Sequence, residues 1–402
     1  MQKPPGKVAG DAAELLPASQ SEVGRIHKYI ALAYAAKIKL YQAYQQDETT
    51  HAVTSINKEL LREVVSLCDQ VTASNRYGLL DDFQGLDLVA NENGKESVFA
   101  IQYSMNDGTE SAGRINWSNL LNSPGGGSPY GGDGFFLPSQ DLINAYQTDA
   151  NGLPDFNYQS KSDYSWAVLN NGVYTLQNTT PNVDPRLDFV VGRPTITWKT
   201  YPDKPCEGWV RDKETYGYNC AKRFWVSPES SDMFNGWPWG ASQLNWQIIR
   251  YADILLWKAE ALIELNEGDG LETARDLINQ IRNRARNSAY VKDFNDHSNY
   301  AANYLVNPYP ADVWNQDYAR QALRWETRLE KALEGERFFD LVRWGIVETT
   351  MNKYITAESD NRIYYANAHF TGGKDEYYPV PNNQYGFSGG KYVQNPGYAP
   401  FN

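Results

Sequence analysis

The sequence LNWQIIRYADILLWKAEALIELNEGDGLETARDLINQIRNRARN, from Leu244 to Asn287, decides the fold. In its first half, apolar residues recur at the spacing of one helix face, at Ile248, Ala252, Leu255, Ala259 and Leu262. The second half repeats this spacing at Leu271, Ala274, Ile278, Ile281 and Ala285. The first of these predicted helices is apolar on almost every face, so we expect it to be buried.

Turn-forming residues separate the two predicted helices. Asn266, Gly268 and Gly270 favour an end to the first helix, because Asn and Gly readily adopt the left-handed backbone found after helices. Asp269, followed three residues later by Glu272, has the form of a capping box, which would satisfy free amides at the start of the second helix. The stretch therefore predicts a helical hairpin with a tight turn.

Three stretches of the chain carry a family resemblance. RYADILLWKAEAL followed by ARDLINQIRNRA resembles the central helical hairpin of the SusD/RagB family, whose members are starch-binding and related lipoproteins of the outer membrane. RWETRLEKALEGERFFDLVRWG (324–345) and YYPVPNNQYG with VQNPGY (377–398) are similar to two later family segments in the same order. The resemblance implies a mostly α-helical, tetratricopeptide-like scaffold of helical hairpins, with a loop-rich, partly extended insertion that carries the ligand site.

We expect one domain over residues 1–402, because helical patterns lie at both ends of the sequence and loops lie between them. Its expected parts are a helical hairpin with a short strand (11–105), a loop-rich ligand-binding region (106–243), central and C-terminal scaffold helices (244–345) and an extended C-terminal tail (346–402).

Composition excludes some classes of function. The chain has 37 Lys and Arg against 49 Asp and Glu, which gives a net charge of −12. Because nucleic-acid binding needs clustered positive charge, we expect no nucleic-acid partner. It also has 12 Trp and 28 Tyr, and so many Tyr predict numerous half-wet positions where one end of the ring meets solvent or ligand.

The resemblance also implies a location and a partner. The start of the chain, MQKPPGKVAG, has neither the apolar core nor the cleavage site of a secretory signal. Family members carry an N-terminal lipidated Cys and several helices before the point where this sequence starts, so the resemblance implies that the N-terminal part is lacking. It further implies lipid anchoring at the extracellular face of the outer membrane and a SusC-like, TonB-dependent transporter as partner.

The segment NGWPWG (235–240) supplies the chemistry of a glycan site. A sugar ring has an apolar CH face and a rim of hydroxyl groups, which flat aromatic rings with polar neighbours can bind. The family often places its site aromatics on loops just upstream of the central hairpin, where this segment falls. The predicted ligand-binding residues are Trp237, Trp239, Asn235, Trp209, Arg211, Tyr216 and Tyr130. The alternative for each ring is that it clamps a long loop onto the helices.

The three cysteines divide into a pair and a single residue. Cys206 and Cys220 flank a loop, and in an oxidising compartment they would either form a disulfide or remain two thiols. Cys68 lies in a helical pattern, which predicts a buried small apolar residue.

Enzymatic motifs are absent from the sequence. It has no HExxH, CxxC or GxSxG, and its four His are scattered singly. We expect no catalytic residue, no cofactor and no metal, and we predict non-catalytic capture of an oligosaccharide or polysaccharide. Capture of peptides, as by RagB-like proteins, is the nearest alternative, and glycoside hydrolysis is a more distant one.

Overall fold

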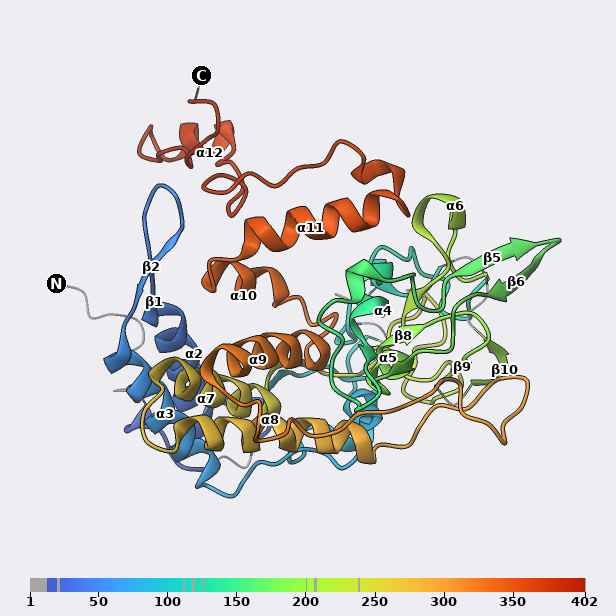
Figure 1. Cartoon of the computed structure of the whole chain (residues 1–402), viewed down its shortest axis with the longest axis horizontal. Coiled ribbons are helices and arrows are strands. Elements are labelled where there is room, and N and C mark those ends of the chain that lie inside the picture. Colours follow the sequence, from blue (N-terminus) through green and yellow to red (C-terminus); the bar gives the residue numbers. More distant parts are fainter. Residues whose placement is uncertain are drawn as a thin grey trace.

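Figure 1 shows a computed structural model of the chain, in which residues 13–19, 22–110, 113–117, 120–125, 127–199, 201–205, 208–237 and 239–401 are described. The long helices lie on the left, together with the β1–β2 pair (residues 44–56) and α12 (Asn382–Phe387), and the remaining short strands and short helices with their loops lie mainly on the right. The scaffold helices are α2 (Lys28–Ala43), α3 (Lys58–Thr72), α7 (Tyr251–Leu265), α8 (Gly270–Asn287), α9 (Gln316–Glu330), α10 (Arg337–Arg343) and α11 (Val347–Ser359). The prediction of a mostly α-helical fold is confirmed.

The strands are short and pair in twos. The antiparallel pairs are β1 (Tyr44–Gln46) with β2 (Val53–Ile56), β3 (Ser97–Ile101) with β12 (Trp246–Arg250), β4 (Gln147–Thr148) with β7 (Asn182–Val183), β5 (Ala167–Asn170) with β6 (Val173–Leu176), β8 (Val191–Gly192) with β11 (Cys220–Ala221), and β9 (Thr197–Trp198) with β10 (Tyr201–Pro205). The shorter helices are α4 (Gln140–Ala145), α5 (Arg186–Val190), α6 (Lys213–Tyr216) and α12 (Asn382–Phe387).

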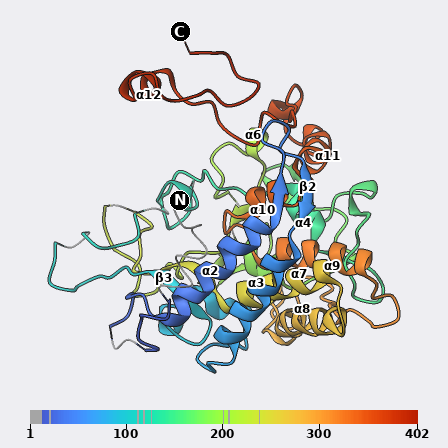
Figure 2. The same ribbon diagram turned by 90° about the vertical axis from the view of Figure 1, so that its left-hand side faces the viewer.

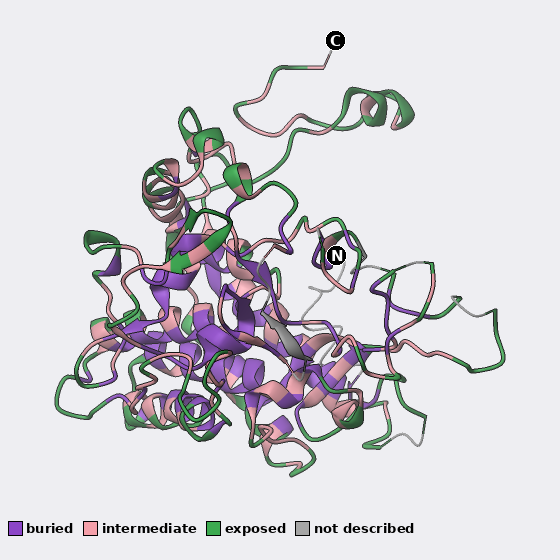
Figure 3. Cartoon of the chain, turned by 90° about the vertical axis from the view of Figure 1, so that its right-hand side faces the viewer, coloured by how far each residue is buried: buried purple, intermediate pink, exposed green. Residues whose placement is uncertain are grey.

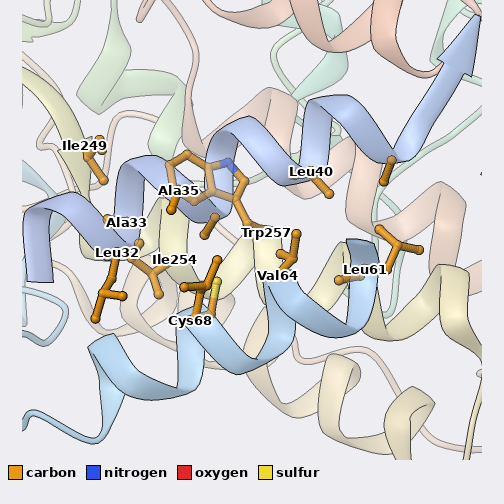
Figure 4. Close-up of a cluster of buried hydrophobic side chains, with 14 of the residues drawn as sticks. Leu32, Ala33, Ala35, Leu40, Leu61, Val64, Cys68, Ile249, Ile254 and Trp257 are labelled. Atoms are coloured by element: carbon orange, nitrogen blue, oxygen red, sulfur yellow. The ribbon is translucent and has the colours of Figure 1, made fainter. Parts of the chain in front are cut away.

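Helices α2, α3 and α7 share one hydrophobic core. The inner face of α2 is rich in Ala, whose small side chains let the neighbouring helices approach closely. Figure 4 shows Trp257 of α7 filling the space beneath α2, with Cys68 and Val64 of α3 beside it. Cys68 is fully buried as predicted, and this burial raises the pKa of its thiol. Asn57 fixes the start of α3, because its side chain accepts hydrogen bonds from the amides of Glu59 and Leu60.

The central hairpin forms as predicted except at two points. Ile248 is expected in the first helix, but it lies in β12, and α7 begins only at Tyr251. The strand prevails because β3 offers its backbone as a hydrogen-bonding partner, which helical spacing cannot reveal. Asn266 ends α7 with φ of 51°, as the turn prediction requires. The capping box at Asp269 is wrong, because its backbone is not extended and its side chain makes no capping bond.

The chain after α8 returns to helix and then differs from expectation. Gly335, with φ of +86°, separates α9 from α10. Residues 346–402 are predicted to be extended, yet α11 occupies the first part of this segment. Pro379 is the first proline after Gly345, so nothing in the intervening sequence prevents a helix. The segment around α12 projects away from the scaffold (Figure 2), and Figure 3 shows it as mostly exposed.

A buried network of charges joins the helices to the insertion. Glu330, at the end of α9, is fully buried and pairs with Arg250 at 3.0 Å, with Arg186 at 3.2 Å and with Arg284. Burial alone would raise the pKa of Glu330, but the Arg284, Arg250 and Arg186 guanidinium groups lower it to about 2. One carboxylate therefore connects α9 with α8, with the start of α7 and with α5 of the insertion.

Removing the Glu330 charge is expected to destabilise the whole fold. Glu330→Gln leaves three buried guanidinium groups without their shared partner, which should lower the free energy of unfolding by about 3–5 kcal/mol. The measurement is urea denaturation, with Asp317→Asn as control, because the Asp317 side chain is 93% exposed in its pair with Arg320. The control should lose less than about 1 kcal/mol. Similar small losses in both variants would contradict this role for Glu330.

A second buried carboxylate makes stability depend on pH. Glu358 of α11 is 1% exposed and accepts a hydrogen bond from the amide of Asp141 at 2.5 Å. Burial raises the pKa of Glu358 to about 7, and the nearby Asp141 and Asp163 charges add to this rise. The hydrogen bond from the Asp141 amide and the Arg362 charge lower the pKa and offset part of the rise. The pKa of Glu358 in the folded protein lies above the ordinary 4.5. The stability that Glu358 contributes is therefore fully present below about pH 4.5 and is lost as pH rises through 7.

Glu358→Gln should remove that loss, because the amide keeps an acceptor for Asp141 and cannot ionise. The variant is expected to gain stability relative to the wild type as pH rises from about 5 to 8. Denaturation midpoints measured across this range provide the comparison. A stability difference between variant and wild type that stays constant with pH would refute the assignment.

Candidate functional site

The predicted aromatic segment forms a closed loop, here called the Trp loop (residues 233–242, described except for residue 238). Met233 and Ser242 form an antiparallel bridge at its base, and the Phe234 amide donates to the Ala241 carbonyl at 2.8 Å. The tip carries Asn235, Trp237 and Trp239. The loop therefore has a hydrogen-bonded stem at its base.

Both indole rings of the Trp loop face solvent. Trp237 is 76% exposed and Trp239 is 54% exposed, and Asn235 between the stem and the rings is exposed as well. Large aromatic side chains are usually highly buried on average, so two exposed indoles two positions apart make the Trp loop the candidate ligand-binding surface.

A glycine-rich loop (residues 123–134, described except for residue 126) supports the Trp loop. A Cβ atom added at Gly131 would lie 3.4 Å from Cβ of Trp239, so the two loops touch at this point. Gly240 has φ of +76°, and a Cβ there would lie 3.0 Å from both Oγ of Ser123 and the carbonyl oxygen of Tyr130. Glycine at this position thus allows a close backbone approach that a larger residue would prevent.

Arg211 is held on the same glycine-rich loop. Its Nη2 donates to the Gly132 carbonyl at 2.8 Å, and its Nη1 lies 3.1 Å from the Asp133 carboxylate. Its side chain remains 58% exposed. The structure therefore brings Arg211 and Trp239 to one loop, with Asp133 as a polar neighbour that sequence reasoning did not identify.

Two predicted ligand-binding residues are buried instead. Tyr130 is fully buried, and its hydroxyl donates to the Val226 carbonyl at 2.7 Å and accepts from Nε1 of Trp198 at 2.9 Å. Trp209 is 2% exposed, with its ring centroid 4.9 Å from that of Trp198. The prediction that Tyr130 and Trp209 contact ligand is wrong, because their rings form the packed floor beneath the loops.

Tyr216 and the cysteine pair lie elsewhere. Tyr216 ends α6, is 49% exposed and packs against Tyr364 of the C-terminal segment with ring centroids 6.1 Å apart. It therefore belongs to a different surface cluster from Arg211. Cys206 lies outside the described residues, and Cys220 is buried with its Sγ 3.8 Å from the Gly192 carbonyl. The Cys206–Cys220 disulfide stays a prediction.

Two exposed aromatics were missed, one at the base of the Trp loop and one directly after the glycine-rich loop. The amide of Asn116 donates to the Ser242 carbonyl at 2.9 Å, which places Trp117, 49% exposed, next to the loop base. Phe135, 74% exposed, follows the glycine-rich loop directly. Each stands beside polar or glycine residues in the sequence, in NWSN and GDGFF, and that setting was the available signal.

Acidic side chains complete the surroundings of the Trp loop. A cavity of about 250 Å³ is lined by Asp232, the residue before the loop, and by Glu229 and Ser230. Asp232 accepts hydrogen bonds from Nε2 of Gln243 at 2.7 Å and from Oγ of Ser230 at 3.0 Å. Exposed ring faces with amide, carboxylate and guanidinium groups nearby suit a ligand that has an apolar face and a polar rim.

The described part of the chain offers two negative findings. No cluster of three or more His, Cys, Asp or Glu in it is arranged to hold a metal ion. No helix in it is both long enough and apolar enough to cross a bilayer.

The chain belongs to the SusD family. A sequence profile described as "SusD family" matches residues 95–398, which is most of the chain and includes the insertion, the central hairpin and the tail. This confirms the resemblance stated from the three sequence motifs. No curated protein matches the sequence.

Solved structures share the fold at low sequence identity. A SusD superfamily protein from Bacteroides vulgatus ATCC 8482 has a TM-score of 0.62 at 21% identity, covering 94% of this chain and 64% of its own. A SusD homolog from Bacteroides thetaiotaomicron VPI-5482 has a TM-score of 0.65 at 18% identity, covering 98% and 69%. A laminarin-binding SusD-like protein has a TM-score of 0.52 at 21% identity, covering 98% and 68%. This chain therefore spans less than two thirds of the length of the Bacteroides vulgatus protein.

Substitutions in the tip and in the floor should separate by their effect on stability. Trp237→Ala and Trp239→Ala remove largely solvated rings and should change the free energy of unfolding by less than about 0.5 kcal/mol each. Trp209→Ala opens a cavity in the floor and should cost about 3–5 kcal/mol. Thermal and urea unfolding give the comparison, and a large loss for either tip variant would show that its ring is structural.

Proposed function

We propose that this protein binds oligosaccharides or polysaccharides without turnover, and that the Trp loop makes the principal contact. The observation that carries the proposal is the pair of exposed indoles, Trp237 and Trp239, on a loop braced by a second loop. Family membership supports the ligand class, since one similar structure is a laminarin-binding SusD-like protein and another is surface glycan-binding protein A from Bacteroides thetaiotaomicron.

The physical basis is stacking with polar contacts at the ring edges. The indole faces lose contact with water when an apolar sugar face covers them, and this burial is favourable. Asn235 and Arg211 offer donors, while Asp133 offers acceptor atoms, so hydroxyl groups at the rim of the sugar can exchange water for protein partners. The hydrogen-bonded stem and the Gly131 contact fix the loop beforehand, which lowers the entropy cost of binding.

The same proposal includes a location and a transporter. We infer that the protein acts at the extracellular face of the outer membrane through a lipid anchor, and that it delivers the bound glycan to a SusC-like, TonB-dependent transporter. The support is kinship with the SusD family, whose members work in this way. Such a partner would need a surface separate from the Trp loop, so that ligand and transporter can be engaged together.

Binding to soluble polysaccharides tests the proposal. Laminarin, starch, xylan, mannan and galactan are compared by affinity electrophoresis and calorimetry, and at least one should bind. Trp237→Ala and Trp239→Ala should each weaken that binding by about 1–3 kcal/mol, on the scale known for bases stacked on aromatic rings. Tyr392→Ala is the matched control, because Tyr392 is 53% exposed on the projecting tail.

The alternatives give different outcomes. Binding of peptides in place of every polysaccharide would favour peptide capture. Release of new reducing ends would indicate hydrolysis. Unchanged polysaccharide affinity in both tip variants would refute the Trp loop as the site while leaving the fold assignment intact.

A further inference from the structure

A cavity of about 780 Å³ lies between the end of α2, β1, α10 and the part of the C-terminal tail that contains residues 375–378. Its volume falls within the range of about 300–1,000 Å³ typical of sites for small ligands. It shares no lining residue with the Trp loop or the glycine-rich loop. Figure 2 shows α10 and β2 well to the right of the teal loops that follow β3, so this cavity lies apart from those loops.

Aromatic rings from three separate segments line this cavity. Tyr41 and Tyr44 come from the end of α2 and from β1, Phe339 from α10, and Tyr377 and Tyr378 from the tail. Phe339 is 58% exposed and Tyr378 is 91% exposed, so ring surface remains open at the rim. The single aliphatic side chain among the described lining residues is that of Val342. Walls of this kind offer flat faces, which fit rings better than they fit branched apolar side chains.

Two buried polar atoms of the lining have no hydrogen-bond partner among the described residues. They are Nε of Arg343, whose side chain is 3% exposed, and Oε2 of Glu376. The other Glu376 oxygen accepts from the amide of Gly373 at 3.1 Å. Both atoms are shielded from water, so a ligand in the cavity meets instead the partly exposed side chains of Gln46 and Asp375. An amide can donate and accept hydrogen bonds and a carboxylate can accept them, which matches the hydroxyl groups of a sugar.

The charge of the cavity disfavours an anionic ligand. Arg343 is neutralised by Glu260 and by Asp340, the latter at 3.0 Å. No other Lys or Arg is found among the described lining residues, whereas Asp375 and Glu376 are. A phosphate, sulfate or uronate group would therefore meet carboxylates without a free cation to pair with.

We propose that this cavity is a second carbohydrate site, for a short neutral oligosaccharide whose rings stack on the tyrosines and phenylalanines and whose hydroxyls pair with Gln46 and Asp375. The inference rests on the proposed function for its ligand class, but it does not depend on the Trp loop. Two sites on one protein would hold a long polysaccharide at two points, and the second contact would then be favoured by a high effective concentration.

Calorimetry with short oligosaccharides tests the number of sites. The probes are the tetrasaccharides of the β-1,3-, β-1,4- and α-1,4-linked glucans, of xylan and of mannan. The wild type should bind two molecules of at least one probe per chain. The double variant Trp237→Ala/Trp239→Ala should keep the cavity site, and Phe339→Ala/Tyr378→Ala should keep the Trp-loop site. The quadruple variant should bind none.

Phe387→Ala/Tyr392→Ala is the matched control, because both residues are exposed on the same tail and neither lines the cavity. It should bind two molecules, as the wild type does. Unchanged binding by Phe339→Ala/Tyr378→Ala, with complete loss in the Trp-loop double variant, would overturn the second site and leave the proposed function standing. Binding of tetrapeptides at the cavity in place of sugars would also overturn it. Absence of binding to every sugar would overturn both proposals.

Discussion

The structure depends on the burial of Glu330 among three arginines. A lone buried carboxylate would be strongly destabilising, so the fold is stable only when Arg186, Arg250 and Arg284 all reach the end of α9. Each arginine comes from a different element, and each is itself almost fully buried. The network therefore fixes α7, α8 and α9 relative to one another, and through Arg186 it fixes the first turn of α5 in the insertion as well.

This constraint explains how an insertion of short elements can hold a defined shape. Its described helices have at most six residues, too few to be stable alone. Arg223 extends the network into the insertion by pairing with Asp87 and Glu334. The rings of Trp198, Trp209 and Tyr130 pack together in one hydrophobic cluster, which forms the floor of the insertion. The loops over that floor are left free to present side chains to a ligand.

The sequence predicted what local spacing determines and missed what distant partners determine. Helices α7 and α8 follow from apolar periodicity, and Asn266 follows from its tolerance of left-handed backbone. Strand β12 could not be predicted from its own residues, because β3 lies about 150 residues earlier in the chain. Trp209 and Trp239 have equally aromatic, glycine-rich neighbours, and only the packing of Trp198 decides which of them is buried. The buried arginines were also invisible, since Arg and Glu in a helix usually indicate a solvated face.

The central claim is that a rigid, charge-linked scaffold presents a preformed Trp loop to a polysaccharide. Amide hydrogen exchange of the full chain, with and without the polysaccharide that binds in the panel, tests it most directly. The account predicts slower exchange in peptides that cover the Trp loop and the glycine-rich loop, with unchanged exchange in α7, α8 and α9. Binding that leaves both loops unchanged, or that alters exchange throughout those three helices, would contradict it.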